Sequence, residues 1–364
     1  MTNPRSPRLL ISFHDMALGG IQKKIVDISK YLIKHQPDTN VRISLRRRIG
    51  IFINQIPSKT KISSPYRPIY RLGGIRFFLW MVKEILIFSP THILTFMDFS
   101  AIPTIAAAKF VFWKKIKITI GEDILTSKYL DDTYSKAHKR LKQNLIQKYY
   151  PQADSILVQT PVQKKDLENI LNLPNSPKII STPNWLPLDY PYQETYINKD
   201  IDILYVGRIA AQKNLTKFIE IIKQISHKDP HIKATIVGSG EEDDKISQLI
   251  KKNNLQKNIT RVPQIPNPQD YYLKAKYFLL TSDYEGFPLT IMEAIASGCY
   301  PVSYDLPEIR QFFNKDTSSY IYQTNDQAVK LLSSPPPKSL SYYQSKLKKL
   351  QQQHIQKYID FCLN

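Results

Sequence analysis

Hydrophobic positions along the chain fall into two alternating patterns, short β-branched runs and longer amphipathic stretches. Helical stretches such as Ile21–Lys34 and Tyr134–Tyr149 lie between most of the runs. Continuous apolar strands separated by helices are typical of a parallel sheet covered on both faces. In the first half of the chain the runs predict strands at Arg8–His14, Asn40–Leu45, Thr91–Met97, Lys115–Glu122, Ala153–Thr160 and Lys178–Thr182.

A proline-rich segment, residues 182–200, interrupts this alternation. Pro183, Pro187 and Pro191 exclude a regular element there, which predicts a domain boundary. The alternation then resumes, with strands predicted at Ile201–Val206, Ile232–Val237, Asn258–Val262, Tyr277–Thr281 and Tyr300–Ser303.

The fold class that follows is α/β, with two Rossmann-like, doubly wound parallel-sheet domains facing each other across a cleft. We expect an N-terminal domain at 1–187, a second domain at 188–337 and a basic C-terminal helix at 338–364, whose basic face is expected to be solvated. In doubly wound folds ligands bind outside the carboxyl ends of the strands. The sequence therefore directs attention to residues that follow predicted strands.

Composition narrows the class of protein. Hydrophobic residues make up 42% of the chain and charged residues 23%, which is too apolar for a disordered protein. Two cysteines, Cys299 and Cys362, cannot form a disulfide framework or a four-cysteine zinc site, which favours a reducing cytosolic compartment. The apolar run near the start is too short for a signal peptide, and no run of 18 uncharged apolar residues predicts a membrane-spanning helix.

The chain is strongly basic. Lys and Arg number 51 against 31 Asp and Glu, a formal net charge of +20. Such a charge predicts an anionic partner, for which nucleic acid, anionic lipid and a phosphorylated substrate all qualify.

The most informative stretch is 282–298, SDYEGFPLTIMEAIASG. Pro288 suits a first helical turn and Gly298 a helix end, which predicts a helix at Leu289–Ser297 beside a loop holding Glu285. Glu293 lies among apolar neighbours in that helix, an unfavourable place for a carboxylate without partners. A helix amino end suits a phosphate or sugar, and each carboxylate can accept hydrogen bonds from a pair of hydroxyls.

This stretch resembles the Glu-x7-Glu signature of glycosyltransferase family 4, retaining nucleotide-sugar-dependent enzymes with the GT-B fold. Other marks of the family appear in order along nearly the whole chain: Gly19-Gly20, Val206-Gly207-Arg208 with Lys213-Asn214, Gly238-Ser239-Gly240 and Pro301-Val302. Two positions depart from the family pattern, Tyr304-Asp305-Leu306 before Pro307 and Pro263-Gln264 after the strand near Val262. Both positions lie near the rim of the expected nucleotide site, so they affect which nucleotide base the site would prefer.

For the donor side, the resemblance implies a catalytic set of Arg208, Lys213 and Glu285. Arg208 and Lys213 would neutralise the donor diphosphate, since cleavage of the anomeric bond leaves a growing charge that preorganised cations stabilise. Glu285 would position the donor sugar and Glu293 would bind the ribose hydroxyls. The remaining expected donor contacts are Gly19, Gly20, Gly238, Gly240, Gly286, Phe287 and Leu289.

On the acceptor side the candidates are His14, Asp98, Glu122 and Asp123, all at carboxyl ends of predicted strands. A lone histidine such as His14 is also a common loop residue. Asp123 stands where many relatives carry a cation. The resemblance implies that the leaving phosphate takes the acceptor proton, so no protein base is expected. It also implies no cofactor and no metal. Asp200-Ile201-Asp202 has the form of a metal-binding Asp-x-Asp motif, but it opens a predicted strand.

An acid-free block lies between residues 40 and 83. It contains ten cations, namely Arg42, Arg46, Arg47, Arg48, Lys59, Lys61, Arg67, Arg71, Arg76 and Lys83. The block ends in an aromatic stretch with Phe77, Phe78, Trp80 and Met81, which suits an interfacial helix on an anionic membrane surface. The alternative is that the aromatic residues belong to the core and the cations are solvated.

The resemblance implies a retaining glycosyltransferase, transferring a hexosyl or N-acetylhexosaminyl group from a UDP-sugar to a glycan or lipid-linked acceptor in cell-surface polysaccharide or glycoconjugate assembly. It would be cytoplasmic and peripheral on the inner face of the cell membrane. The alternatives are an inactive GT-B binding protein, or a basic nucleic-acid-binding protein. No aromatic RNA-binding motif, zinc finger or arginine–glycine repeat supports the last, and no nucleic-acid partner is expected.

Overall fold

The computed structural model describes residues 6–17, 19–65, 73–187, 189–193, 199–313, 320–335 and 340–363. The chain divides into two compact units. The first contains Met1–Pro187 and Gln352–Asn364, and the second contains Leu188–Gln351.

The first unit is built on a seven-stranded sheet in the order β3-β2-β1-β4-β5-β6-β7, in which all recorded pairings are parallel. Its strands are β1 (Arg8–Phe13), β2 (Asn40–Leu45), β3 (Lys61–Ser63), β4 (His92–Phe96), β5 (Lys117–Glu122), β6 (Ser155–Val158) and β7 (Ile179–Ser181). The predicted strands are therefore present, most of them shorter by one or two residues at their ends. The sequence missed β3, whose three residues are too few to show a pattern.

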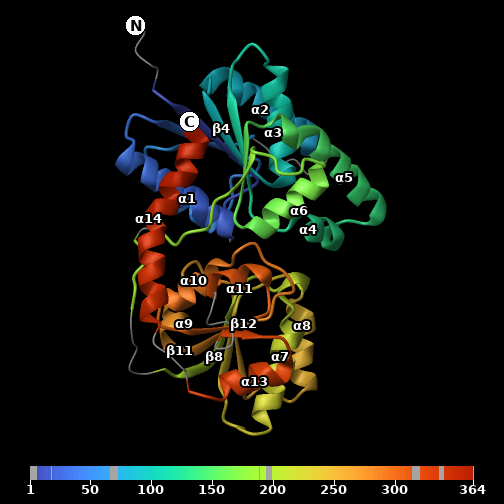
Figure 1. Ribbon diagram of the computed structural model, residues 1–364, viewed down its shortest axis with the longest axis vertical. Coiled ribbons are helices and arrows are strands. Elements are labelled where there is room, and N and C mark those ends of the chain that lie inside the picture. The colour runs from blue at the N-terminus through green and yellow to red at the C-terminus, as the bar shows by residue number, and fades with distance from the viewer. Residues whose placement is uncertain are drawn as a thin grey trace. The chain divides into compact units, whose positions relative to one another are not determined.

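Two hydrophobic cores lie on opposite faces of this sheet. Leu9 and Ile11 of β1 belong to one core and Leu10 to the other, as the two-residue period of a strand requires. Figure 1 shows helices on both faces. The helices of this unit are α1 (Gly20–His35), α2 (Gly73–Phe88), α3 (Met97–Phe110), α4 (Thr126–Thr133), α5 (Lys136–Tyr149) and α6 (Pro161–Leu171), with short 3₁₀ turns η1 (Ile51–Gln55) and η2 (Tyr150–Gln152).

The second unit repeats the architecture with a six-stranded sheet, β10-β9-β8-β11-β12-β13, whose pairings are also parallel. The strands are β8 (Ile201–Val206), β9 (Ala234–Val237), β10 (Ile259–Val262), β11 (Ala275–Leu280), β12 (Tyr300–Tyr304) and β13 (Ile321–Tyr322). The helices are α7 (Leu215–Ser226), α8 (Asp243–Lys252), α9 (Gln269–Lys274), α10 (Leu289–Ala296), α11 (Pro307–Phe313) and α13 (Asn325–Leu332), with the turn η3 (Ala211–Lys213). The predicted α/β class with two doubly wound parallel sheets is confirmed.

The C-terminal helix α14 (Ser341–Leu363) differs from the separate basic segment expected at 338–364. Its last part belongs to the first unit, where Ile355, Tyr358 and Ile359 are buried beside α1 and β1. These apolar positions recur at three and four residues, so they form one helix face that the sheet covers. The Lys- and Gln-rich composition of the tail concealed this face.

The aromatic stretch of α2 does not form the membrane-facing surface that the sequence suggested. Phe77 is 1% exposed and Met81 is 0% exposed, so both lie in the core and cannot enter a membrane. Trp80 is half-buried, and its Nε1 donates a hydrogen bond to Ser44 Oγ at 2.9 Å. The interpretation of these residues as core is therefore the correct one, because α2 turns this face toward the sheet.

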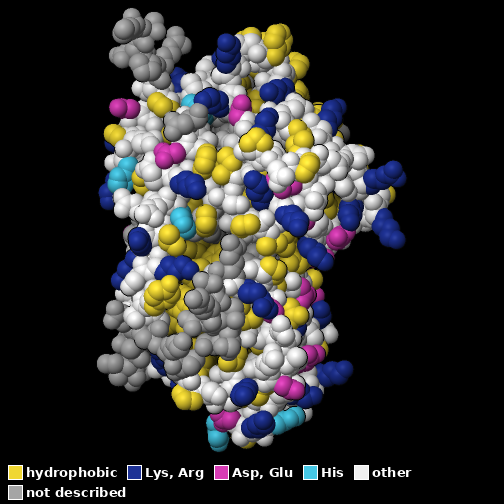
Figure 2. All heavy atoms as spheres, in the orientation of Figure 1, with side chains coloured by type: hydrophobic (Ala, Val, Ile, Leu, Met, Phe, Trp, Pro, Cys, Tyr) yellow, Lys and Arg dark blue, Asp and Glu magenta, His cyan; other side chains and the backbone are white. Residues whose placement is uncertain are grey.

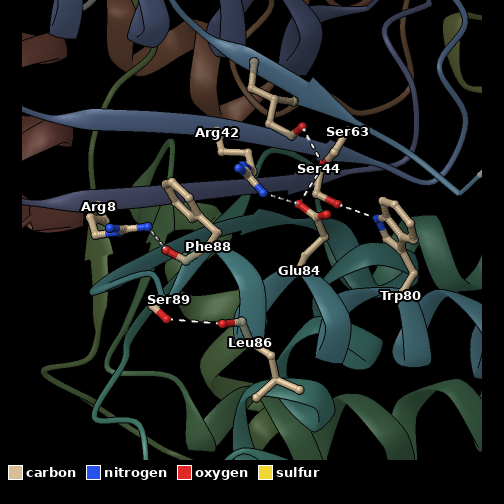
Figure 3. Close-up of polar contacts among 10 residues, drawn as sticks. Arg8, Arg42, Ser44, Ser63, Trp80, Glu84, Leu86, Phe88 and Ser89 are labelled. Carbon is tan, nitrogen blue, oxygen red and sulfur yellow. Dashed lines mark hydrogen bonds and ion pairs between the residues drawn. The ribbon is translucent and has the colours of Figure 1, made fainter.

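The cations of the block from 40 to 83 divide into engaged and exposed residues. Arg42 pairs with Glu84 at 3.5 Å (Figure 3), and Arg47 pairs with Asp15 at 2.6 Å. Arg48, Lys59, Lys61, Arg76 and Lys83 are exposed. Arg67 and Arg71 lie outside the described residues. In the view of Figure 2, Lys and Arg side chains are dispersed over the described surface.

Within the described part of the chain, no helix is both long enough and apolar enough to cross a bilayer.

Candidate functional site

The carboxyl ends of two neighbouring strands, β8 and β11, support two loops that are hydrogen-bonded to each other. Asp283 N donates to Gln212 O at 2.9 Å, and Gln212 Nε2 donates to Tyr284 O at 2.8 Å. Thr281 Oγ1 donates to Lys213 O at 2.9 Å. Because parallel neighbours end at the same edge of the sheet, residues some 70 positions apart in sequence meet here.

Lys213 and Glu285 form an ion pair between these loops. Lys213 Nζ lies 2.5 Å from Glu285 Oε1, which also accepts a hydrogen bond from Ser282 Oγ at 2.6 Å. The carboxylate is almost fully buried, whereas the lysine side chain is one-fifth exposed. The pair thus offers a positive charge to solvent while its negative partner is held inside, an arrangement that suits an anionic ligand.

Asn214 explains why Lys213 projects from this position. Its backbone is left-handed, with φ of 47°, and its Oδ1 accepts from Lys217 N at 3.3 Å as the cap of α7. Asn214 Nδ2 donates to Asp283 Oδ1 at 2.9 Å, which adds a further link to the loop after β11. Asparagine is among the few residues that tolerate this conformation and can cap a helix. The turn before α7 is therefore fixed by its own sequence.

Glu293 is buried on α10 and has a hydrogen-bond partner that the sequence does not suggest. Tyr272 OH donates to Glu293 Oε2 at 3.1 Å. Burial and this carboxylate both raise the pKa of Tyr272 well above its ordinary value, so the hydroxyl keeps its proton. Burial, reinforced by Glu293, likewise raises the pKa of Tyr190, whose OH lies 3.3 Å from Ser297 Oγ.

Arg208 lies in the loop after β8, and its side chain is exposed. Among the described residues, its guanidinium has no hydrogen-bond or ion-pair partner. The backbone carbonyl of Arg208 accepts a hydrogen bond from Tyr205 OH at 2.9 Å, which holds the loop at this point. A fixed backbone with a free cationic side chain leaves the charge available for a ligand.

Gly238 and Gly240 permit the loop after β9 to approach the loop after β8. A Cβ on Gly238, where φ is 153°, would lie 1.9 Å from Gly207 O, and one on Gly240 would lie 2.2 Å from Ile209 O. The two loops are joined by Ile209 N donating to Ser239 O at 3.1 Å. Both glycines therefore have a packing role in the described structure, beside any role in donor binding.

The amino end of α10 lies beside the loop that holds Glu285. Gly286 is buried, while Phe287 and Leu289 are half-buried. The Phe287 ring packs against the Phe312 ring with centroids 5.2 Å apart, and both residues are half-buried. The capping residue is Pro288, and no side chain caps the helix. Ile291 N already donates to Pro288 O at 3.2 Å, so the backbone N–H groups of Leu289 and Thr290 are the ones that a phosphate or hydroxyl could bind.

In the first unit, His14 follows β1 and is half-buried against the edge of the Phe99 ring, with centroids 5.5 Å apart. Burial lowers the pKa of His14; Asp15, 3.7 Å away, opposes this effect, and Arg47 and Arg46 add to it. The imidazole is therefore neutral at neutral pH. Gly19 and Gly20 stand at the start of α1, with Gly19 extended at φ of 175°.

Of the three acceptor-side carboxylates, Asp98 and Glu122 are buried and Asp123 is partly buried, and each has a partner. Asp98 Oδ2 accepts from Lys142 Nζ at 2.7 Å, and Asp123 Oδ1 accepts from Lys24 Nζ at 2.7 Å. Glu122 Oε2 accepts from Tyr150 OH at 2.7 Å. Burial raises the pKa of Glu122 to about 8, the Tyr150 hydrogen bond opposes it, and the charges of Asp98 and Asp123 reinforce it. A neutral carboxyl is therefore expected at pH 7.

The structure thus brings Lys213 and Glu285 together, with Arg208 in the same loop as Lys213 and Glu293 on the adjoining helix. It gathers Asp98, Glu122 and Asp123 separately, at the carboxyl edge of the first sheet. Sequence reasoning missed the partners of these groups, namely Lys24, Lys142, Tyr150, Tyr190, Tyr272 and Ser282. Lys24 had a signal, because it lies three residues after Ile21 and four before Ile28, on the buried face of α1.

Comparisons with known proteins bear on this geometry. Residues 192–334 match the family model of glycosyl transferases group 1. This segment carries Arg208, Lys213, Glu285 and Glu293. An uncharacterized glycosyltransferase of Methanocaldococcus jannaschii is 29% identical over 304 residues, which cover 76% of this chain and 68% of that protein.

A second relative is the N-acetylgalactosamine-N,N'-diacetylbacillosaminyl-diphospho-undecaprenol 4-alpha-N-acetylgalactosaminyltransferase of Campylobacter jejuni. It is 28% identical over 230 residues, which cover 61% of this chain and 60% of the relative. Among solved structures, Anabaena HepE in complex with UDP and glucose superposes with a TM-score of 0.76 at 14% identity, over 98% of this chain and 99% of HepE. The chain therefore has the GT-B fold and is related to glycosyltransferases.

Proposed function

We propose that this chain is a retaining glycosyltransferase that transfers a sugar from a UDP-sugar to a glycan or lipid-linked acceptor. The observation that carries the proposal is the Lys213–Glu285 pair, 2.5 Å apart, at the carboxyl edge of the second sheet. The match of residues 192–334 to glycosyl transferases group 1 supports the reaction class. UDP in HepE supports the choice of base, and the diphospho-undecaprenol acceptor named for the Campylobacter relative supports a lipid-linked acceptor.

The chemistry proposed for this edge is stabilisation of a leaving diphosphate. When the anomeric C–O bond breaks, negative charge grows on the phosphate oxygen that departs. Arg208 is exposed and Lys213 is partly exposed, so both cations can contact a diphosphate. Glu285 would orient Lys213 and accept hydrogen bonds from the donor sugar, and Glu293 would accept hydrogen bonds from the ribose.

The acceptor is proposed to bind the carboxyl edge of the first sheet, near His14 and the carboxylates Asp98, Glu122 and Asp123. Lys142 and Lys24 neutralise two of these carboxylates, and Glu122 is expected to be protonated at neutral pH. None of the three is therefore proposed as a general base. The departing phosphate would take the acceptor proton, and no resident cofactor or metal ion is proposed.

For the cellular setting, we propose cell-surface polysaccharide or glycoconjugate assembly, with the protein in the cytoplasm and peripheral on the membrane. The exposed cations Arg48, Lys59 and Lys61 of the acid-free block support attraction to anionic lipid. Arg42 and Arg47 contribute less, because each already pairs with a carboxylate of the protein.

The proposal is tested by incubating the full chain with a panel of UDP- and GDP-sugars and measuring nucleoside diphosphate release. We expect slow hydrolysis of one UDP-sugar, and proton NMR of a glycosylated product should show the donor's anomeric configuration retained. An inverted product would contradict the retaining mechanism. Failure to bind any nucleotide sugar, together with binding of random oligonucleotides at physiological salt, would favour the nucleic-acid alternative.

A further inference from the structure

Helix α2 and the segment that ends α3 expose large apolar side chains that the core does not use. Phe112 is 80% exposed, Trp113 60% and Leu79 58%. We define the apolar patch as Leu79, Leu86, Ile87, Phe110, Phe112 and Trp113, all of them exposed. Clusters of exposed large apolar side chains are uncommon on monomeric proteins and mark interaction sites.

The residues of this patch come from two neighbouring elements. The Phe78 ring of α2 packs edge-on against Phe110, with centroids 5.9 Å apart. Lys114 Nζ donates to Ser89 Oγ at 2.7 Å, so the segment after α3 is tied to the end of α2. Figure 1 shows α2 and α3 side by side in the same helical layer. Phe112 and Trp113 pack edge-on with centroids 5.3 Å apart and project from the turn that follows α3.

The charged residues within α2 and within residues 109–117 are cations, apart from Glu84. Lys109 and Lys115 flank the aromatic residues and are exposed, and residues 109–117, KFVFWKKIK, contain no Asp or Glu. Glu84 is the only acid of α2, and it turns inward to Arg42 and Ser63, at 3.5 and 2.7 Å (Figure 3). The Leu86 side chain points away from that polar cluster (Figure 3). The outward residues of α2 and of residues 109–117 are therefore apolar groups and cations, and the acid recorded beside them is Asp154, which accepts a hydrogen bond from Ile118 N at 2.8 Å.

We propose that the apolar patch and its flanking lysines dock on an anionic lipid bilayer, with Phe112 and Trp113 entering the headgroup region. This inference rests on the proposed function in one respect: a lipid-linked acceptor would give membrane docking its purpose. Lysine is depleted at protein–protein interfaces, whereas aromatic residues beside Lys are typical of bilayer interfaces. The docking surface thus differs from the aromatic stretch that the sequence suggested, because Phe77 and Met81 are in the core.

The position of the patch leaves the carboxyl edge of the first sheet free. Helix α3 begins with Met97 and Asp98 at that edge, and its 14 residues span about 20 Å before Phe110. Substitutions at Phe112 and Trp113 therefore do not touch the proposed acceptor residues. This separation allows membrane docking and nucleotide binding to be measured independently.

The first test measures co-sedimentation of the full chain with vesicles of phosphatidylglycerol and phosphatidylethanolamine, and with phosphatidylcholine alone. We expect the wild-type protein to prefer the anionic vesicles. Phe112→Ser with Trp113→Ser should lower the partition coefficient at least tenfold. The control Tyr342→Ser, which changes an exposed aromatic residue of the second unit, should bind as the wild type does.

Three further variants separate the contribution of charge to vesicle binding from that of aromatic insertion. Lys109→Gln with Lys115→Gln should weaken binding and reduce its salt dependence, whereas Lys251→Gln with Lys252→Gln on α8 should change neither. Trp113 is the most exposed of the three tryptophans, since Trp80 is half-buried and Trp185 is buried. Vesicles should therefore shift the tryptophan emission to the blue, and Trp113→Phe should abolish most of that shift while retaining binding.

Unchanged vesicle binding by the double aromatic variant would overturn the docking surface. Wild-type protein that binds UDP but no anionic vesicle would overturn docking and leave the proposed function standing. Vesicle binding without nucleotide-sugar binding would overturn the proposed function and leave the docking surface standing. Self-association that Phe112→Ser with Trp113→Ser abolishes, without vesicle binding, would identify a second copy as the partner and would also overturn the membrane assignment.

Discussion

Lys213 Nζ lies 2.5 Å from Glu285 Oε1, although the two residues are 72 positions apart in sequence. This pair places a cation where a departing diphosphate would need one. Lys213→Ala should lower kcat by about 10²–10³, because a preorganised charge acts mainly in the transition state, at about 2.7–4 kcal/mol. KM for the donor should change less. Steady-state kinetics would measure both, with Lys223→Ala at the exposed end of α7 as the control.

Arg208 provides a second test of the same chemistry without a stability penalty. Its side chain is exposed and has no protein partner among the described residues, so Arg208→Ala should leave the melting temperature within about 1 °C of the wild type. Turnover should still fall by about 10²-fold or more. Exposed Lys276, which pairs with Asp202 near the amino ends of β11 and β8, offers a control whose substitution should leave turnover unchanged. Equal turnover in Arg208→Ala would remove this residue from the proposed catalytic set.

Glu293→Gln should weaken UDP binding by about 1–3 kcal/mol, the range for losing charge-assisted hydrogen bonds to the ribose. The amide keeps an oxygen that can accept the bond from Tyr272 OH, so the fold should persist. Titration calorimetry measures the affinity. Tyr272→Phe removes the internal hydrogen bond but keeps the carboxylate, which makes it the control for indirect effects. If both variants weaken UDP binding equally, Glu293 does not contact the nucleotide.

Glu122 should make stability depend on pH in a defined direction. Its pKa is about 8 in the folded protein and about 4.5 when unfolded, so between these values the folded state binds more protons. The contribution of Glu122 to stability is thus full below about pH 4.5 and is lost as pH rises toward 8. Glu122→Gln should flatten this dependence, by an amount of the order of a few kcal/mol at pH 9. Urea unfolding at pH 6 and pH 9 compares the two proteins.

Gly238→Ala should destabilise the second unit by about 1–3 kcal/mol or more. Its φ of 153° disfavours an L side chain, and the added Cβ would lie 1.9 Å from Gly207 O. Gly74→Ala is the matched control, because a Cβ there meets nothing within 4 Å, and alanine should stabilise the first turn of α2 by about 0.5–1 kcal/mol. Thermal unfolding of both variants measures the difference. Equal melting temperatures would show that the close approach at Gly238 relaxes without cost.

Much of the fold could be predicted because the relevant signals are local. A run such as Ile201–Val206 is apolar on both faces, and α7 combines an apolar stripe at Leu215, Phe218 and Ile222 with its own cap at Asn214. Periodicity and capping act over a few residues, so the sequence alone carries them. The short edge strands β3 and β13 have two or three residues, too few for any period, and exist because a neighbouring strand pairs with them.

The chain by itself therefore determined the order of strands and helices, the residue types at the ends of strands, and the net charge of +20. Only the tertiary structure decided which charges meet and which side chains face solvent. Lys213 meets Glu285, and Lys24 meets Asp123, because the parallel sheet order brings distant strand ends to one edge. Similarly, Phe77 is buried and Phe112 exposed, although both are phenylalanines beside cations, because Phe77 lies on the face of α2 that packs into the core, whereas Phe112 lies in the turn after α3.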